Sequence, residues 1–489
     1  MNKTIRRASV FSLLLVLALL GRATWVQFYE GRALADNKEN RRKAIEQYAY
    51  PLGDIIVAGE AITGSERTEH SDLAYKRTYR DGALYAPVTG YSSHLYGANL
   101  LEGVYQDVLD GTAVELRSPL DTMTGKRGEP GDVVTTIDPE VQRAAFKGLG
   151  DKKGAAIALE PATGQVLGMV STPSYDPSRI SGSGSSDTRA WAGLNEKAEK
   201  GAEADEPLVN RAIRKPLAPG STFKLVVAAA ALENGLYDSV DERTKSPSPY
   251  TLPDSSTVLE NLIRTAPCED ASLRTALQYS CNNVFAKAAV DLGQDKVRAM
   301  AEKFGFNDAE LDVPVRAYES VYPKGMDRPS TALTGIGQFE VTATPLQVAM
   351  VTAAIENDGE LVTPNLVSRV TDADGNVLED VDPASERVLS ESTARQLRSA
   401  METVVEDGTG GNARIAGAKV GGKTGTAQRG VNNSETPYVW FTSYAQDPDS
   451  GKQVAVAVLI EQSDAARSEV SGNGQAAPIA KAMMEAALR

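Results

Sequence analysis

One long apolar run dominates the pattern at the start of the chain. It extends from Ala8 to Leu20 and resumes after Arg22. A membrane-spanning helix needs about 20 apolar residues, and residues 8–28 reach that length if the charge of Arg22 lies at the membrane surface. The pattern therefore predicts a transmembrane signal-anchor within residues 1–29.

The charges around this run predict its orientation. Lys3, Arg6 and Arg7 precede it, and positive charge favours the cytoplasmic side of a membrane. We therefore expect a single-pass protein of the cytoplasmic membrane, with its N-terminus inside and its main part outside. A cleaved signal peptide is the alternative, because residues 33–35 (Ala-Leu-Ala) resemble a cleavage site. They lie well beyond the apolar run, so the anchor is the preferred interpretation.

The pattern beyond the anchor changes near residue 154. Residues 30–153 carry short β-type runs, such as 54–57 and 133–137, which turn residues and charges separate. We predict that they form an elongated, β-rich pedestal domain. Two apolar runs joined by a turn predict a β-hairpin over 154–170, and the Ser-, Gly- and Glu-rich residues 178–206 predict a flexible loop.

Helical patterns follow, and strands return near the end of the chain. Apolar periodicity and stop signals predict helices at 221–233, 271–279, 283–292, 343–357 and 476–488. Strands are predicted at 420–428 and 454–461. Because helices lie between two groups of strands, we expect an α+β domain over residues 154–489, to whose sheet the hairpin adds strands.

Composition narrows the possible functions. Of 489 residues, 51 are Lys or Arg and 65 are Asp or Glu, which gives a net charge of −14. That balance argues against general nucleic-acid binding, which needs a basic face. The two histidines, His70 and His94, and the two cysteines, Cys268 and Cys281, are too few and too scattered for a zinc site. We expect neither a metal nor a cofactor.

Two short motifs place a hydroxyl group near an amine or an amide. Ser221 and Lys224 share one face at the start of a predicted helix, where the helix dipole stabilises an alkoxide. Serine needs a base to become a nucleophile, and a crowded lysine can lose its proton and serve as one. Ser280 and Asn282 lie between two predicted helices, where Ser280 could relay a proton to a leaving group and Asn282 could bind a substrate amide or steady Lys224. Helix capping alone would explain either motif separately.

A third motif, Gly-Gly-Lys-Thr-Gly-Thr, occupies residues 421–426 in a β-type run. Alternation predicts that Lys423 and Gly425 face one side of the strand and that Thr424 and Thr426 face the other. Gly425 permits close approach of a substrate backbone. Lys423 would add positive charge, and the threonine hydroxyls could hold a carboxylate. A Gly-rich hairpin with a solvated lysine is the alternative.

Together, the motifs Ser-x-x-Lys, Ser-x-Asn and Lys-Thr-Gly occur in the order found in penicillin-binding proteins and serine β-lactamases. Behind a membrane anchor, they make the chain resemble a class B penicillin-binding protein over almost its whole length. It is most similar to the actinobacterial penicillin-binding protein A group. Two residues depart from the family pattern: Leu52 stands where arginine is common, and Phe339 where a small residue is common.

The resemblance implies a serine-type D,D-transpeptidase with a transpeptidase or β-lactamase-like catalytic fold. Ser221 would attack the D-Ala-D-Ala end of a peptidoglycan stem peptide, with Lys224 as its base. The terminal D-Ala would leave with a proton relayed through Ser280 and Lys423. An amine of a neighbouring stem would then accept the acyl group and complete a cross-link.

Substrate contacts are implied in the same way. Asn282 would orient the peptide, and Thr424, Gly425 and Thr426 would bind its terminal carboxylate region. The backbone N–H groups of Ser221 and Thr426 would hold the oxyanion. β-Lactam antibiotics would acylate Ser221. The resemblance also implies a role in cell-wall synthesis during growth or division, with a membrane glycan polymerase of the shape-elongation-division-sporulation family as partner.

Other members of this motif class are less consistent with the sequence. A bifunctional enzyme would carry a glycosyltransferase motif, and a class A β-lactamase would carry Glu-x-x-Leu-Asn between the second and third motifs; neither string occurs. D,D-carboxypeptidases rarely carry a large N-terminal module behind an anchor. A catalytically silent scaffold is the alternative outside enzymology, but all three motifs are intact.

The two cysteines form a candidate disulfide. Cys268 and Cys281 flank the predicted helix 271–279, and the anchor places both where thiols oxidise. Closing a loop of this size stabilises a fold by about 3 kcal/mol in the chain-entropy model. Such a bond would pin the backbone that carries Ser280 and Asn282. Two buried free thiols are the alternative.

Overall fold

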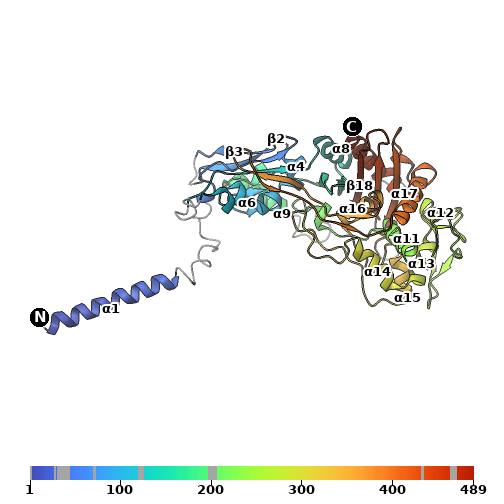
Figure 1. Cartoon of the computed structure of the whole chain (residues 1–489), viewed down its shortest axis with the longest axis horizontal. Coiled ribbons are helices and arrows are strands. Elements are labelled where there is room, and N and C mark those ends of the chain that lie inside the picture. Colours follow the sequence, from blue (N-terminus) through green and yellow to red (C-terminus); the bar gives the residue numbers. More distant parts are fainter. Residues whose placement is uncertain are drawn as a thin grey trace.

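The structure is a computed structural model, and it describes residues 3–26, 29, 45–69, 73–118, 126–196, 206–430, 434–462 and 471–489. Helix α1 (Lys3–Trp25) is 23 residues long and stands apart from the body of the protein (Figure 1). In the described part of the chain it is the one helix long and apolar enough to cross a membrane. This suits a single-pass anchor. The alternative cleavage site at 33–35 lies outside the described residues.

The N-terminal part of the body contains helices as well as strands. Strand β1 (Ile55–Val57) pairs antiparallel with β2 (Glu60–Ala61) and parallel with β7 (Asp132–Thr135). The other elements are short: β3 (Thr63–Arg67), β4 (Tyr75–Tyr79), α4 (Gly82–Thr89), β5 (Ser92–Ser93), β6 (Gly97–Ala98), α5 (Leu100–Val104), α6 (Gln106–Leu109) and η2 (Val114–Leu116). The predicted pedestal is therefore mixed α and β.

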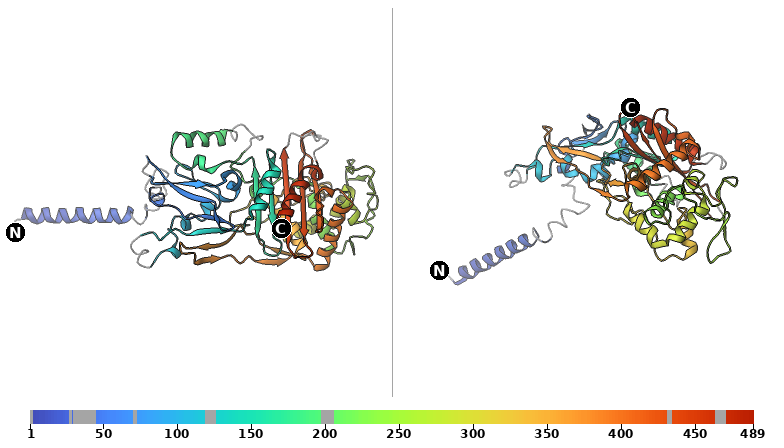
Figure 2. Two further views of the ribbon diagram at one scale, coloured as in Figure 1. Left: turned by 90° about the horizontal axis from the view of Figure 1, so that it is seen from above. Right: turned by 45° about the vertical axis from the view of Figure 1, so that its right-hand side comes forward.

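Two strands from the far half of the sequence complete the N-terminal sheet. Strand β13 (Val367–Thr371) pairs antiparallel with β7, and β14 (Val377–Asp380) pairs with β13. The sheet order is β14-β13-β7-β1-β2. In Figures 1 and 2 the orange strands β13 and β14 lie beside the blue N-terminal strands. The predicted boundary at residue 153 places β13 and β14 in the catalytic domain, so this pairing is not expected from the sequence.

The second sheet is the core of the catalytic half. Its order is β16-β17-β18-β8-β9, and each neighbouring pair is antiparallel. The predicted hairpin forms β8 (Lys153–Leu159) and β9 (Val166–Thr172), and the two predicted strands are β16 (Lys419–Ala427) and β18 (Gln453–Gln462). The sequence prediction lacks β17 (Tyr438–Gln446), although its β-branched and aromatic residues are typical of a strand.

Both faces of this sheet are buried, as strand β18 illustrates. Its odd-numbered residues over 455–459 belong to one apolar core with α16 (Pro345–Glu356), which is buried along its whole length. Its even-numbered residues over 454–460 belong to a second core with α8 (Pro139–Leu149) and α18 (Ala477–Ala487). Because side chains alternate across a strand, a strand apolar at nearly every position needs helices on both sides.

The helices of the catalytic half follow the predicted ranges closely. Predicted helices 221–233, 271–279 and 283–292 correspond to α11 (Lys224–Glu233), α12 (Leu273–Gln278) and α13 (Asn282–Leu292). Predicted helices 343–357 and 476–488 correspond to α16 and α18. The remaining helices and short elements are α10 (Arg211–Arg214), β10 (Tyr250–Thr251), β11 (Val258–Leu259), α14 (Gln294–Lys303), α15 (Arg328–Thr334), β12 (Glu360–Val362), β15 (Ser385–Arg387) and α17 (Glu391–Glu406).

A helix, α9 (Ser185–Glu196), lies within the segment predicted as a loop. Its Trp191 stacks on Tyr96 with ring centroids 4.0 Å apart and meets the edge of Tyr91. These aromatic contacts dock α9 on the N-terminal part and explain why a Ser- and Gly-rich segment is helical here. Residues 197–205 of the predicted loop lie outside the described residues.

A buried carboxyl group makes stability depend on pH. Glu356, at the end of α16, is 2% exposed, and its Oε2 has no hydrogen-bond partner among the described residues. Burial raises the pKa of this carboxyl to about 8; Glu402 and Asp358 raise it further, while Arg398 and Lys419 lower it. The folded state thus keeps a proton that the unfolded chain releases, so stability falls as pH rises from 4.5 towards 8.

Glu356→Gln should remove this pH-dependent loss, because the amide stays neutral. We expect the melting temperature of the variant, relative to the parent, to be higher at pH 8 than at pH 5, measured by thermal unfolding. The exposed residue Glu340 offers a matched control. The melting temperature of Glu340→Gln should differ from that of the parent by the same amount at both pH values. An equal effect of Glu356→Gln at pH 5 and pH 8 would contradict the prediction.

Candidate active site

Ser221 lies in a short helical turn that leads directly into α11. The turn is η5 (Gly220–Phe223), and Ser221 within it is 6% exposed. Gly220 has φ +53°, and its N–H donates to the carbonyl of Gly337 at 3.0 Å. A Cβ at Gly337 would lie 2.0 Å from the Gly220 oxygen. Two glycines are therefore needed where these backbones meet, and their contact fixes the turn that carries Ser221.

Lys224 lies fully buried at the first position of α11, one turn after Ser221. Its Nζ donates to the backbone oxygen of Ser280 at 2.8 Å, to Ser280 Oγ at 3.2 Å and to Asn282 Oδ1 at 2.8 Å. Burial holds the pKa of Lys224 well below its ordinary value of 10.5, and the charge of Lys423 lowers it further. The neutral form of the amine is therefore favoured compared with a solvated lysine.

Ser280 lies in the tight turn between α12 and α13, and Asn282 is the first residue of α13. Ser280 has φ +58°, an uncommon conformation for a residue other than glycine. This turn brings the Ser280 hydroxyl and backbone oxygen, and the side chain of Asn282, to the amine of Lys224. The structure thus joins the first two sequence motifs in one hydrogen-bonded cluster.

Strand β16 supplies the third motif. Lys423 is fully buried, and its Nζ donates to Ser280 Oγ at 3.0 Å and to the backbone oxygen of Thr424 at 2.9 Å. Burial lowers the pKa of Lys423 to about 7. The Ser280 hydroxyl consequently lies between the amines of Lys224 and Lys423. The pKa of each amine lies well below that of a solvated lysine.

Gly425 lets β16 approach the turn that carries Ser221. A Cβ at Gly425 would lie 2.9 Å from the Thr222 methyl group and 3.0 Å from the Pro219 oxygen. Nearby, Trp440 Nε1 donates to the backbone oxygen of Ala218 at 2.9 Å. A side chain at Gly425 would therefore displace the strand from the serine.

Some of the predicted site residues border an open cleft of about 270 Å³, whereas Lys224, Asn282, Lys423 and Gly425 do not line it. Ser221, Ser280, Thr424 and Thr426 all line it. The other lining residues are Leu262, Ile263, Tyr279, Thr409, Ser471, Gly472 and Asn473, and no sequence motif identifies them in advance. They come from four separate places in the chain, among them the start of the short helical element η9 (Gly472–Ala476). His94, in contrast, lies in the N-terminal part, where it bonds the backbone oxygen of Tyr75; His70 lies outside the described residues.

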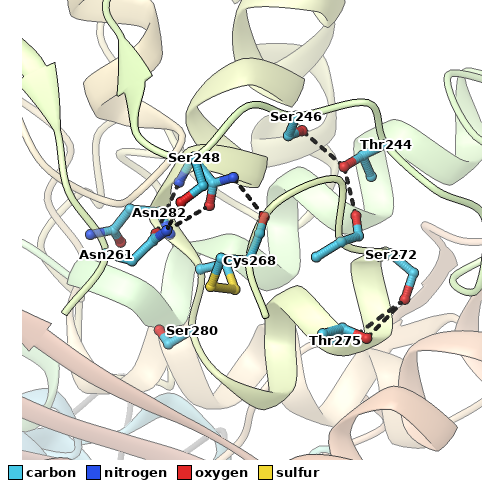
Figure 3. Close-up of a disulfide and its surroundings, with 12 residues drawn as sticks. Thr244, Ser246, Ser248, Asn261, Cys268, Ser272, Thr275, Ser280 and Asn282 are labelled. Carbon is cyan, nitrogen blue, oxygen red and sulfur yellow. Dashed lines mark hydrogen bonds between the residues drawn. A yellow bond between two sulfur atoms is a disulfide. The ribbon is translucent and has the colours of Figure 1, made fainter. Parts of the chain in front are cut away.

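Cys268 and Cys281 form a disulfide in the structure, with their Cα atoms 5.6 Å apart (Figure 3). Both residues are buried. Cys281 is the residue between Ser280 and Asn282, so the bond ties the α12–α13 turn to the segment that precedes α12.

A buried serine, two buried amines and a Ser-x-Asn turn at the edge of a helix-covered antiparallel sheet define a penicillin-recognising serine enzyme. Residues 154–485 match the penicillin binding protein transpeptidase domain, and residues 52–133 match the penicillin binding protein A dimerisation domain. The chain belongs to the penicillin-binding protein family.

Similar proteins extend the comparison over the whole chain. The peptidoglycan D,D-transpeptidase PbpA of Mycolicibacterium smegmatis is 36% identical over 100% of this chain and 99% of its own length. PbpA of Mycobacterium tuberculosis is 35% identical over the same shares of the two chains. The solved structure of M. tuberculosis penicillin-binding protein A as a ceftriaxone acyl-enzyme complex superposes with a TM-score of 0.82 and 33% identity, over 91% of this chain and 100% of that chain.

The two buried lysines should differ in their effect on acylation. If Lys224 is the base that the sequence motif predicts, Lys224→Ala should lower the rate of acylation by penicillin by about 10²–10⁴-fold. Lys423→Met removes a charge that lowers the pKa of Lys224, so the acid limb of the pH–rate profile should move to higher pH.

Both variants are measured by the pH dependence of the second-order acylation rate constant. Lys481→Ala, on the distant helix α18, is the matched control and should leave the profile unchanged. A normal rate in Lys224→Ala, or an acid limb that moves to lower pH in Lys423→Met, would exclude the assigned roles.

Thiol counting tests the disulfide. Full-length protein from cells that express it in the membrane, denatured without reduction, should show no free thiol, and two should appear after reduction, because Cys268 and Cys281 are the only cysteines. Cys268→Ser should then show one thiol without reduction. Two free thiols in the unreduced parent protein would rule out the bond.

Proposed function

We propose that this chain is a serine-type D,D-transpeptidase that cross-links peptidoglycan and is acylated by β-lactams. One observation carries the proposal: the amines of Lys224 and Lys423 meet at the Ser280 hydroxyl, beside a cleft that Ser221 lines. The family membership of the chain and the D,D-transpeptidase activity for which its mycobacterial relatives are named support it.

The first half of the reaction forms an acyl-enzyme. Ser221 Oγ attacks the carbonyl carbon of the penultimate D-Ala while its proton passes to the neutral amine of Lys224. The bond to the terminal D-Ala nitrogen then breaks, and that nitrogen takes a proton through the Ser280 hydroxyl. The distances of 3.2 and 3.0 Å from Ser280 Oγ to the two amines support this relay.

The second half transfers the acyl group. A free amine of a neighbouring stem peptide attacks the ester carbon, the amine loses its proton to the basic cluster, and Ser221 recovers its hydroxyl. The products are a new amide cross-link and the free enzyme. A cleft that is open at its rim, rather than enclosed, supports the entry of a second peptide.

Strand β16 supplies the groups that hold the substrate. Thr424 and Thr426 line the cleft and donate hydroxyl groups to the terminal carboxylate, while Asn282 orients the peptide amide. The backbone N–H groups of Ser221 and Thr426 hold the oxyanion. In support, a Cβ at Gly220 would lie 3.0 Å from the backbone of Thr426, so the two segments are in contact.

The membrane arrangement follows from the charges near α1. Lys3, Arg6 and Arg7 keep the N-terminus in the cytoplasm, and the catalytic half lies outside, where its substrate is. The proposed partner is a membrane glycan polymerase of the shape-elongation-division-sporulation family, since a cross-linking enzyme needs newly made glycan strands.

A covalent adduct tests the proposed function. The full chain in detergent, incubated with benzylpenicillin, should gain one adduct in the peptide that contains Ser221, detected by mass spectrometry, because this serine is the nucleophile. Ser221→Ala should gain none, whereas Ser272→Ala, which changes only a helix cap, should gain the adduct. An adduct on another residue would overturn the assignment, and its loss within seconds would favour a β-lactamase.

A further inference from the structure

Helix α13 begins at the active site without a cap from its own N-terminal segment. Its cap position is Cys281, whose sulfur is bonded to Cys268 and makes no cap hydrogen bond. The first N–H groups of a helix have no partner within it, and a buried N–H without an acceptor is costly. Asn282 and Asn283 therefore need an acceptor from elsewhere in the fold.

Asn261 supplies that acceptor from a segment twenty residues earlier. Its Oδ1 accepts the N–H of Asn282 at 2.6 Å and the N–H of Asn283 at 3.3 Å. Its Nδ2 donates to Asn283 Oδ1 at 3.0 Å and to Ser248 Oγ at 3.2 Å. Figure 3 shows Asn261 beside Asn282, above Ser280 and next to the disulfide. One side chain thus replaces the missing local cap.

The same segment orients the side chain of Asn282. The backbone oxygen of Glu260 accepts from Asn282 Nδ2 at 3.0 Å, which leaves Asn282 Oδ1 to accept from Lys224 Nζ at 2.8 Å. If the carboxamide were reversed, its NH₂ group would face the lysine amine and its oxygen would face a carbonyl. Residues 260–261 therefore determine which end of Asn282 meets the base.

A second anchor holds the helix start from the other side. Asn283 Nδ2 donates to the backbone oxygens of Cys268 at 2.7 Å and Pro247 at 3.0 Å. Leu262 and Ile263, which directly follow Asn261, line the cleft and are 59% and 39% exposed. The capping segment thus continues into the rim where a substrate enters.

From these contacts we infer that Asn261 is a positioning residue for acylation, which acts through Asn282 on Lys224 by capping α13 from a separate segment. The inference rests on the roles proposed above for Ser221, Lys224 and Asn282. Because Asn261 does not line the cleft, its loss should affect the chemical step rather than the binding of the β-lactam.

The test compares Asn261→Ala with Asn261→Asp in the full chain. Stopped-flow acylation with benzylpenicillin separates the acylation rate constant from the binding constant of the first complex. Asn261→Ala should lower the rate constant about tenfold and leave the binding constant nearly unchanged. Asn261→Asp keeps the acceptor that caps the helix but loses the donor to Asn283 Oδ1, so it should acylate faster than Asn261→Ala and more slowly than the parent.

Asn365→Ala is the matched control. Asn365 is a buried asparagine that bonds the backbone oxygen of Thr163, far from the motifs, so its loss should lower the melting temperature without changing the acylation rate constant. A parental rate in Asn261→Ala, or a change only in binding, would overturn the inference. The inference would also be overturned if Asn261→Asp, shown by its melting curve to be folded, acylated no faster than Asn261→Ala. If the parent itself gains no Ser221 adduct, the proposed function fails instead.

Discussion

The Lys224 amine is buried, and in the described part of the chain none of its hydrogen-bond partners is a carboxylate; the rest of the site depends on this constraint. An ammonium ion in such a place is costly, so burial favours the neutral, basic form. Its partners, Ser280 and Asn282, offer oxygen atoms without negative charge. A carboxylate in their place would stabilise the ammonium and remove the base. The side chains of Ser280 and Asn282 carry no charge. For that reason they do not stabilise the ammonium form of Lys224 as a carboxylate would.

This environment is assembled from three parts of the chain that meet only in the folded state. Helix α11, the α12–α13 turn and strand β16 each contribute one motif, and each is fixed by contacts of its own. Gly337 lets the turn that carries Ser221 pack closely against it, and Gly425 does the same for β16. The disulfide and Asn261 hold the α12–α13 turn. Since β16 is the edge strand of its sheet, its free side is left to face the cleft.

The motifs and most regular elements could be predicted from the sequence because each is a local pattern. Ser221 and Lys224 share a helix face, and the hairpin over 154–170 alternates visibly. Strand β17 could also have been found from its aromatic and β-branched residues. Three features could not be predicted, because each depends on a partner distant in sequence. They are the pairing of β13 with β7, the docking of α9 through Trp191 and the cap from Asn261.

The position of β13 and β14 also orders events during synthesis. The chain is made from its N-terminus. Strand β7 can pair with β1 early, but it acquires its second neighbour, β13, only after residues 367–371 exist. By then Ser221 and Ser280 have been synthesised. The N-terminal sheet therefore closes only after much of the catalytic half exists, and pairing over so long a separation is slow. During synthesis, the pedestal is therefore complete only after most of the catalytic half has been made.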